Sequence, residues 1–173
     1  MTQTFNSPHT AHPAFQASRQ LGDHLQQVLV DLTDLHLQAK QLHWNVVGKN
    51  FRDTHLVLDE VVDAAREFTD QVAERMRAIY VTPDARVRTV AARTSLPEVP
   101  NDEIDTADTV DAIVASLYAV AGTIRRVHDE VDEEDPTSAD ILHAVLERIE
   151  QLAWLIDSEN RVANSSIPRS VPE

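Results

Sequence analysis

The chain has 173 residues, a formal net charge of −14, 42% hydrophobic residues, three glycines and no cysteine. This composition predicts a single domain with a core large enough for long helices, and it excludes a disulfide framework, a thiolate metal site and a cysteine nucleophile. The amino end does not resemble a signal peptide, and no apolar run approaches the roughly 18 residues of a membrane span. We therefore expect a cytoplasmic protein with no membrane segment.

Four long helices are predicted between two tails. Residues 1–17 mix Pro, Ser, Thr, Asn and His and are expected to form a flexible arm. Over 18–46, apolar residues recur in alternating steps of four and three, which is typical of a helix in a bundle: Leu21, Leu25, Val28, Leu32, Leu35, Ala39 and Leu42. Gly48 ends this helix, and a second helix free of Gly and Pro is predicted over 51–80.

A long connection separates the second helix from the third. Residues 82–100 contain Pro83, Pro97 and Pro100. This segment is too long for a tight turn between antiparallel neighbouring helices. A third helix is predicted over 106–133 and a fourth over 137–162, after the break at Pro136. Residues 163–173 are expected to fray, so the predicted bundle domain is 18–162.

Five potential metal ligands lie in or just before the second helix: His43, His55, Asp59, Asp70 and Glu74. Within each of the pairs His55–Asp59 and Asp70–Glu74 the residues are four apart and share a helix face, and Asp70 lies only about 20° around the axis from Asp59. Along the axis, however, His55 and Asp70 are about 22 Å apart. Metal–ligand bonds are about 2 Å long, so one helix cannot close one site with both pairs.

An antiparallel copy of the same helix would solve this problem. The residue numbers of His55 and Glu74 add up to 129, as do those of Asp59 and Asp70. A two-fold axis near Ala64 would therefore place each pair opposite the other pair of the partner, and His43 could join the His55 half. Any one charged pair is ordinarily a solvated helix face, but five residues that obey one symmetry favour two equivalent metal sites. Carboxylate and imidazole ligands on helices suit iron.

The stretch 37–77 closely resembles the signature of the Dps family, the mini-ferritins also described as DNA-binding proteins from starved cells. The resemblance rests on His-Trp-Asn-Val at 43–46, Gly48, Phe51, the two spaced pairs and Arg75. It implies an all-α, ferritin-like four-helix bundle with a short helix at 87–95 in the long connection. It also implies a hollow dodecamer and a di-iron ferroxidase centre between two subunits, formed by His43, His55 and Asp59 of one subunit and by Asp70 and Glu74 of the other.

The same resemblance implies a function. The family oxidises Fe(II), usually with hydrogen peroxide in preference to oxygen, and stores Fe(III) as a mineral, which protects against oxidative damage. Trp44 resembles a tryptophan that intercepts stray radicals, although a core aromatic is an equal interpretation. The acidic residues before Pro136 resemble those that line iron-entry pores, with Asp129, Asp132 and Asp140 as the better candidates and a solvated turn as the alternative.

Two other functions remain open at this point. A DNA-binding, nucleoid-compacting protein with little ferroxidase activity is disfavoured, because the first 20 residues contain only Arg19 and the last 13 only Arg161 and Arg169. A monomeric di-iron enzyme would need an intrachain Glu-x-x-His motif, which the sequence lacks. The nearest pattern, Asp140-x-x-His143, is interpreted as a surface pair. His36 is expected at the core or an interface, and Trp154 in packing.

Overall fold

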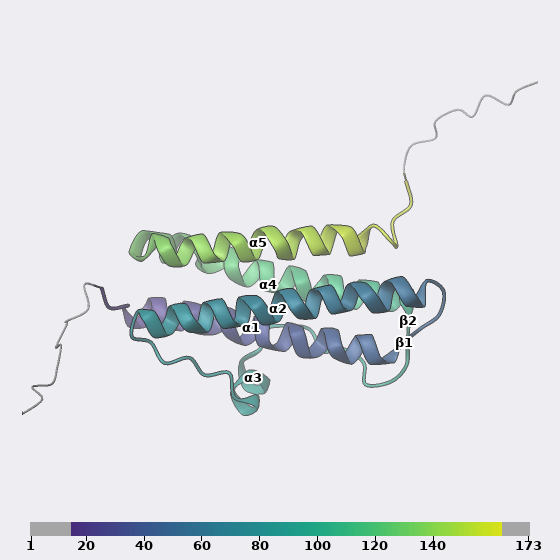
Figure 1. The fold of residues 1–173 in the computed structure, drawn as a ribbon, viewed down its shortest axis with the longest axis horizontal. Helices are drawn as coiled ribbons and strands as arrows, with labels where there is room; N and C mark the ends of the chain where they lie inside the picture. Colours follow the sequence, from purple (N-terminus) through teal and green to yellow (C-terminus); the bar gives the residue numbers. More distant parts are fainter. Residues whose placement is uncertain (1–14, 164–173) are drawn as a thin grey trace, which may run out of the picture.

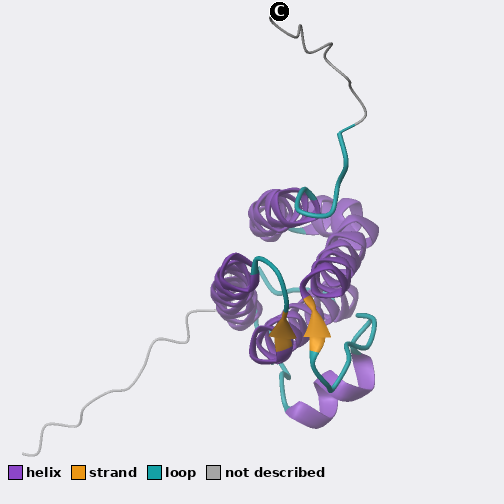
Figure 2. Cartoon of the chain, turned by 90° about the vertical axis from the view of Figure 1, so that its right-hand side faces the viewer, coloured by secondary structure: helices purple, strands orange, loops and turns teal. Residues whose placement is uncertain are grey.

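The computed structural model describes residues 15–163, which form a bundle of four long helices. The helices are α1 (Arg19–Asn45), α2 (Phe51–Ala78), α4 (Thr106–Glu134) and α5 (Pro136–Asp157). A short helix, α3 (Val87–Arg93), lies outside the bundle against α1 (Figure 1). Viewed end on, the four long helices surround a common core (Figure 2). The predicted fold class, a four-helix bundle with a short helix in the long connection, is therefore confirmed.

The apolar stripes predicted from the sequence form this core. All seven stripe residues of α1 are at most 2% exposed, and α2 contributes Leu58, Val61, Val62, Ala65, Phe68, Val72 and Met76. α1 packs mainly on α2 and α4, while α4 packs mainly on α5. Burial of each large aliphatic side chain contributes about 1.5–3 kcal/mol, so these stripes contribute substantially to the bundle's stability.

The starts of α2 and α4 are as predicted, and the other ends of the long helices differ from the predicted bounds by one to five residues. Ser18 lies just outside α1 as its N-cap, and its Oγ accepts a hydrogen bond from the Leu21 amide at 3.1 Å. α5 stops at Asp157, five residues before Val162, because the Ser158 hydroxyl donates to the Trp154 carbonyl and the Asn160 side chain donates to α4. Side-chain hydrogen bonds of this kind compete with helical ones, and periodicity does not reveal them.

The loops that follow the first two helices also end them earlier than predicted. α2 ends at Ala78, and Tyr80 adopts a left-handed conformation with φ of 68°. Val46, predicted as helical, instead belongs to the two-residue strand β1 (Val46–Val47). This strand pairs in parallel with β2 (Ile104–Asp105), so that the end of α1 lies beside the start of α4.

The long connection is anchored by a buried carboxylate. Asp31 on α1 is fully buried and accepts hydrogen bonds from the Ser95 amide and hydroxyl at 2.9 and 2.7 Å. It also accepts one from Thr123 on α4 at 2.7 Å. Because Ser95 makes these contacts, α3 ends at Arg93 rather than at the predicted Ser95. Asp31 thus joins the connection to two helices of the bundle.

Within residues 15–163, α4 is the one helix that passes a length-and-hydropathy test for a membrane span. An 18-residue window of α4 has a mean hydropathy of 1.3, and 56% of that window is buried inside the bundle. Buried core helices pass the same test. The sequence-based search missed this window because it looked for uninterrupted apolar runs, whereas α4 is apolar only on average.

Candidate metal centre

Two of the predicted ligands, His43 and His55, form a mutually oriented pair. His43 lies in the last turn of α1 and is 8% exposed, whereas His55 lies in the second turn of α2. The rings are stacked with centroids 3.6 Å apart and planes 25° apart. Nδ1 of His43 is 2.9 Å from the carbonyl oxygen of His55, and Nδ1 of His55 is 3.0 Å from the carbonyl oxygen of His43.

This reciprocal arrangement prepares both rings for a metal ion. A carbonyl oxygen only accepts hydrogen bonds, so each Nδ1 must carry the donating proton. The Nε2 atom of each neutral ring then keeps its lone pair, which is the form that binds metal. The backbone therefore fixes the same tautomer in both histidines.

The turn between α1 and α2 brings these histidines together. Gly48 has φ of +119°, a conformation that side chains with a Cβ rarely adopt. A Cβ on Gly48 would also lie only 2.8 Å from Oδ2 of Asp105. Phe51 begins α2, and its ring lies 5.2 Å from that of His55. Gly48 thus permits the sharp return of the chain that stacks His55 on His43.

Asp59 lies next to the histidine pair and is held by a lysine. Its Oδ1 is 3.3 Å from Nδ1 of His43 and 2.5 Å from Nζ of Lys40. The hydrogen bond from Lys40, together with the positive charge of its ammonium group, holds the pKa of Asp59 below its usual value. The carboxylate is therefore ionised at neutral pH and available as an oxygen ligand, but a metal ion must compete with Lys40 for it.

Asp70 and Glu74 lie further along α2 with their side chains exposed. Among residues 15–163, neither forms a hydrogen bond or ion pair. Asp70 lines a cavity of about 600 Å³ between α1, α2 and the start of the long connection, with Thr33, His36, Arg66 and Pro83 among its other lining residues. Partial burial, with a contribution from Arg66, lowers the pKa of His36, which agrees with the expected core or interface position.

One chain does not bring the five predicted ligands together. Within residues 15–163, no three His, Asp or Glu side chains converge closely enough to hold one metal ion. His43, His55 and Asp59 are grouped near the α1–α2 turn, whereas Asp70 and Glu74 lie at the other end of the same helix. This separation was predicted from the spacing, and it leaves each group as part of a site.

Both tryptophans are too exposed to be core residues of the single chain. Trp44, beside His43, is 69% exposed, which removes the core interpretation and leaves its radical-intercepting role as a prediction. Trp154 is 58% exposed in the single chain, so it does not pack in the core of its own bundle, and the prediction that it is a packing residue stays untested. Trp154 lies on the outer face of α5, whose inward face is formed by its neighbours Leu152, Ala153 and Ile156.

Several acidic residues in the segment before Pro136 form hydrogen bonds or ion pairs with other parts of the chain. Asp135 is buried and binds Arg75 through both carboxylate oxygens, at 2.6 to 3.2 Å, and it also accepts from the Ser138 hydroxyl. Glu130 binds His24 at 2.8 Å, and Glu134 binds the amide and hydroxyl of Ser18. These contacts compensate for an acidic helix end that opposes the helix dipole.

The three predicted pore residues, Asp129, Asp132 and Asp140, are all exposed. Two of them lie beside histidines, because Oδ1 of Asp129 is 3.0 Å from Nδ1 of His128 and Oδ1 of Asp140 is 3.8 Å from Nδ1 of His143. The predicted surface pair of Asp140 and His143 is therefore present, but it is part of a larger group that the sequence did not reveal. The pore role of the aspartates remains a prediction.

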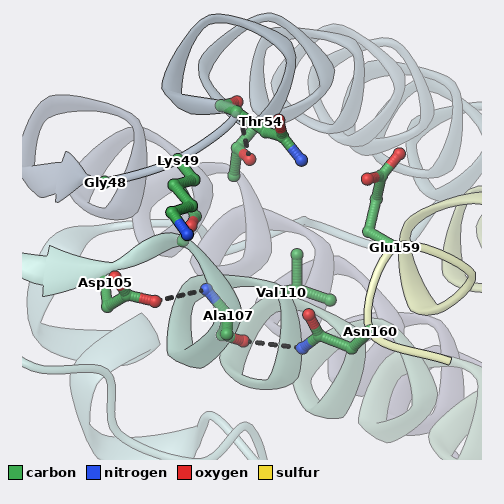
Figure 3. A pocket seen from close by; sticks show the side chains of 10 residues that line it. Gly48, Lys49, Thr54, Asp105, Ala107, Val110, Glu159 and Asn160 are labelled. Atoms are coloured by element: carbon green, nitrogen blue, oxygen red, sulfur yellow. Dashed lines mark hydrogen bonds between the residues drawn. The ribbon is translucent and has the colours of Figure 1, made fainter. Parts of the chain in front are cut away.

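A further cavity of about 510 Å³ lies where the α1–α2 turn meets the start of α4 (Figure 3). Asp105 caps α4 by accepting from the Ala107 amide at 2.9 Å, and Asn160 donates to the Ala107 carbonyl at 2.8 Å. Lys49 and Glu159 extend into the same region. None of the predicted ligands lines this cavity, so we assign it to the packing of the helix ends.

Comparison with known proteins identifies the fold family. A ferritin-like domain matches residues 22–161. DNA protection during starvation protein 2 of Deinococcus radiodurans is 34% identical over 130 residues, covering 75% of this chain but only 54% of that relative. The chain thus spans about half the length of this relative. DNA protection during starvation protein of Agrobacterium fabrum is 32% identical over 135 residues, covering 78% of this chain and 83% of the relative.

A solved structure agrees with these matches. The crystal structure of Dps92 from Deinococcus radiodurans superimposes with a TM-score of 0.81 at 30% identity, covering 84% of this chain and 88% of the other. The region 22–161 that matches the ferritin-like domain contains α1 from Gly22 onward, the other three long helices in full and all five predicted ligands. The chain therefore belongs to the Dps family of ferritin-like proteins.

Proposed function

We propose that this chain is a ferroxidase and iron-storage mini-ferritin whose di-iron centres lie between two antiparallel subunits. His43, His55 and Asp59 of one subunit would bind Fe(II) together with Asp70 and Glu74 of the other. The observation that carries the proposal is the reciprocal bonding of His43 and His55, which leaves two imidazole Nε2 atoms free beside an ionised carboxylate. Purely structural histidines have no need of two matched free nitrogens.

The geometry of α2 supports the two-fold arrangement. Ala64 and Ala65, on either side of the predicted axis, pack inside the bundle of their own chain with 7% and 0% exposure, so the support for the axis is the spacing of the ligand pairs and not a close approach at these alanines. The cavity beside Asp70 offers a concave surface for residues of a second chain. The exposed carboxylates of Asp70 and Glu74 have no partner among residues 15–163, so no internal ion pair has to be broken when they bind a metal ion.

The residues fit the chemistry of iron oxidation. Neutral imidazole suits Fe(II), and hard carboxylate oxygens stabilise Fe(III), so a mixed site accommodates the substrate and the product. Two Fe(II) ions at one centre supply the two electrons that reduce one molecule of hydrogen peroxide to water, without release of a hydroxyl radical. Lys40 stabilises the carboxylate of Asp59 until the metal ion replaces it.

We extend the proposal to assembly and location. The resemblance to ferritin-like cages supports a hollow homo-oligomer, and we propose a dodecamer in the cytoplasm. The names of the relatives refer to DNA protection, and we propose that this chain protects DNA by removing Fe(II) and peroxide. Direct DNA binding is disfavoured by the net charge of −14. It is also disfavoured because the chain has only two lysines, of which Lys40 is already paired with Asp59.

The test is anaerobic loading with Fe(II) followed by hydrogen peroxide or oxygen, with the oxidation rate and the soluble iron per subunit as readouts. The variant is Asp70→Asn, Glu74→Gln. A matched control, Glu98→Gln with Glu147→Gln, removes the same two charges at exposed positions. We expect fast oxidation with iron kept soluble in the native and control chains, and a rate near that of protein-free buffer in the variant.

Two results would contradict the proposal. If the native chain does not exceed the protein-free rate with either oxidant, the ferroxidase function is wrong and DNA binding or assembly becomes the leading function. If the native chain is fast and the Asp70→Asn, Glu74→Gln variant is equally fast, oxidation occurs elsewhere on the protein. Light scattering on the same samples gives the mass, and a value near one subunit would refute the cage.

A further inference from the structure

Asp63 and Arg66 are exposed residues of α2 that lie on either side of the predicted two-fold axis. Within the part of the chain that the structure describes, residues 15–163, neither side chain forms a hydrogen bond or an ion pair. Their neighbour Glu60 differs, because Arg148 of α5 lies 3.3 Å from its carboxylate. An acidic and a basic side chain are thus left without partners at the point where a second copy of α2 is expected.

These two side chains share the direction of the predicted ligands. At about 100° per residue, Asp63 and Arg66 lie about 60° apart around the axis of α2, and Asp59 and Asp70 lie between them. The residue numbers of Asp63 and Arg66 add up to 129, as those of the ligand pairs do. The two-fold axis that assembles the proposed metal centres therefore also sets Asp63 of each chain opposite the partner's Arg66.

An apolar side chain and a cavity follow the same symmetry. Leu56 on α2 is 50% exposed, and its residue number and that of Ala73 also add up to 129. Ala73 lines the cavity of about 600 Å³ together with Arg66 and Asp70. An antiparallel copy of α2 brings its Leu56 to the mouth of this cavity, which has room for a leucine side chain. The cavity and the charged pair therefore fit the same partner, a second copy of this chain.

The charges also distinguish this register from its neighbours. If opposite residue numbers add up to 130, Asp63 faces the partner's Glu67, and if they add up to 126 or 132, Asp63 or Arg66 faces its own copy. Like charges that face each other in this way repel. Packed helices lie about 8–10 Å apart between their axes, a separation that a long arginine and a short aspartate can bridge.

An attraction between the chains is needed before iron binds. The same symmetry sets Asp59 opposite the partner's Asp70, and two carboxylates that share a site repel each other when no metal ion lies between them. The pairs of Asp63 with Arg66 occur twice, once on each side of the axis, and they offset this repulsion. The two halves of each empty centre can then stay together until Fe(II) arrives.

We propose that Asp63 and Arg66 form two symmetric ion pairs between two copies of this chain, which fix the register of the antiparallel α2 helices and hold the metal centres together before iron binds. The inference rests on the two-fold arrangement of the proposed function. It adds the residues that select the partner and the register, and neither residue is a predicted metal ligand.

The test measures partner choice between two charge-reversed chains, Asp63→Arg and Arg66→Asp. Each variant alone meets like charges across the axis, whereas a dimer of one of each restores both attractive pairs. The full-length variants are refolded together in equal amounts with a metal chelator, the oligomer is dissociated to dimers, and native mass spectrometry measures the fraction of mixed dimers. Random pairing gives about one half. We expect roughly nine tenths, because facing like charges cost several kcal/mol.

Two controls accompany this mixture. The native chain mixed with Glu147→Arg, a reversal of charge at an exposed position of α5, should give about one half mixed dimers. The double variant Asp63→Arg, Arg66→Asp restores opposite charges within one sequence, and we expect it to dimerise with itself as the native chain does. Circular dichroism of each chain shows whether the helices are retained.

A neutral variant keeps the test decisive if a charge-reversed chain does not fold. Arg66→Gln changes an exposed side chain, and we expect its dimer dissociation constant at low salt to rise about tenfold, with a smaller rise at high salt. A mixed fraction of about one half for the complementary variants, or an unchanged dissociation constant for Arg66→Gln, would overturn the proposal.

The outcome is separate from that of iron oxidation, because the chelator removes metal ions from the mixture. Preferred mixed dimers in a protein without ferroxidase activity would support the ion pairs and refute the proposed function. Fast iron oxidation by the native chain, together with random pairing of the two variants, would refute the ion pairs alone.

Discussion

The two-fold centre can be tested by mixing two inactive variants. One variant, His55→Gln with Asp59→Asn, lacks the ligands near the α1–α2 turn. The other, Asp70→Asn with Glu74→Gln, lacks the ligands at the far end of α2. Since His55 and Asp70 of one chain are about 22 Å apart, they cannot bind one metal ion, and every complete centre must combine two chains.

The symmetry fixes the size of the expected effect. In a two-fold dimer of the two variants, one centre receives all the native ligands and the other receives all the substituted ones. Random pairing of equal amounts makes about half of the dimers mixed, so about one quarter of all centres are intact. We expect each variant alone to oxidise Fe(II) at the protein-free rate, and the mixture to reach about one quarter of the native rate per subunit.

The assay follows Fe(II) oxidation by hydrogen peroxide after the two variants are unfolded and refolded together. An affinity tag on one variant, which must retain the other on a column after the oligomer has been dissociated to dimers, shows that mixed dimers have formed. If mixed dimers are present and their rate is only that of the separate variants, the ligands of one centre do not come from two chains. The symmetry argument would then be refuted, even if the native protein is a ferroxidase.

Three substitutions test other parts of the structure. Lys40→Gln removes the ammonium group that competes for Asp59, and we expect anaerobic titration to show Fe(II) binding roughly five- to tenfold tighter; unchanged or weaker binding would contradict this. Burial alone would raise the pKa of Asp135, but hydrogen bonds from its arginine and serine partners hold that pKa below its usual value. Asp135 therefore stabilises the fold above about pH 4, and this contribution is lost as the pH falls through the lowered pKa. We expect Asp135→Asn to cost about 3 kcal/mol in urea unfolding at pH 7 and to flatten the pH dependence below pH 4, and an unchanged pH profile would contradict this. Gly48→Ala should lower the midpoint of thermal unfolding because of its positive φ and the contact at 2.8 Å. Gly122→Ala on α4 should raise it, because the added Cβ would meet only the Arg126 side chain, at an ordinary contact distance of 3.6 Å.

Helical periodicity predicts the parts of this fold that depend on burial. The stripe from Leu21 to Leu42 is buried as its spacing requires, and the segment 51–78 is a single helix because no Gly or Pro interrupts it. Periodicity cannot predict contacts between residues distant in sequence. In the sequence Asp31 looks like an ordinary polar residue of an exposed helix face, yet it is fully buried. Its carboxylate accepts hydrogen bonds from Ser95 and Thr123, which lie 64 and 92 positions away in the sequence.

The candidate site also has a part that the sequence predicts and a part that it does not. The spacing of His55, Asp59, Asp70 and Glu74 predicts both their common face and their separation along α2, because these follow from the geometry of one helix. The hydrogen bonds that orient His43 and His55 involve two helices and the turn at Gly48, and no spacing rule reveals them. The contact between His128 on α4 and His143 on α5, whose Nε2 atoms are 2.6 Å apart, was missed for the same reason. The signal available in the sequence, Asp140-x-x-His143, gave only the half of that group that lies on one helix.

Several basic residues of the bundle are paired with carboxylates of the same chain. Lys40 pairs with Asp59, Arg75 with Asp135, Arg125 with Glu150 and Arg148 with Glu60. A phosphate backbone would have to compete with these internal partners as well as with the net charge of −14. We expect the same excess of carboxylate to attract Fe(II), because a negative surface raises the local concentration of cations. Charge and internal pairing therefore both favour protection through capture of iron, which requires no contact with DNA.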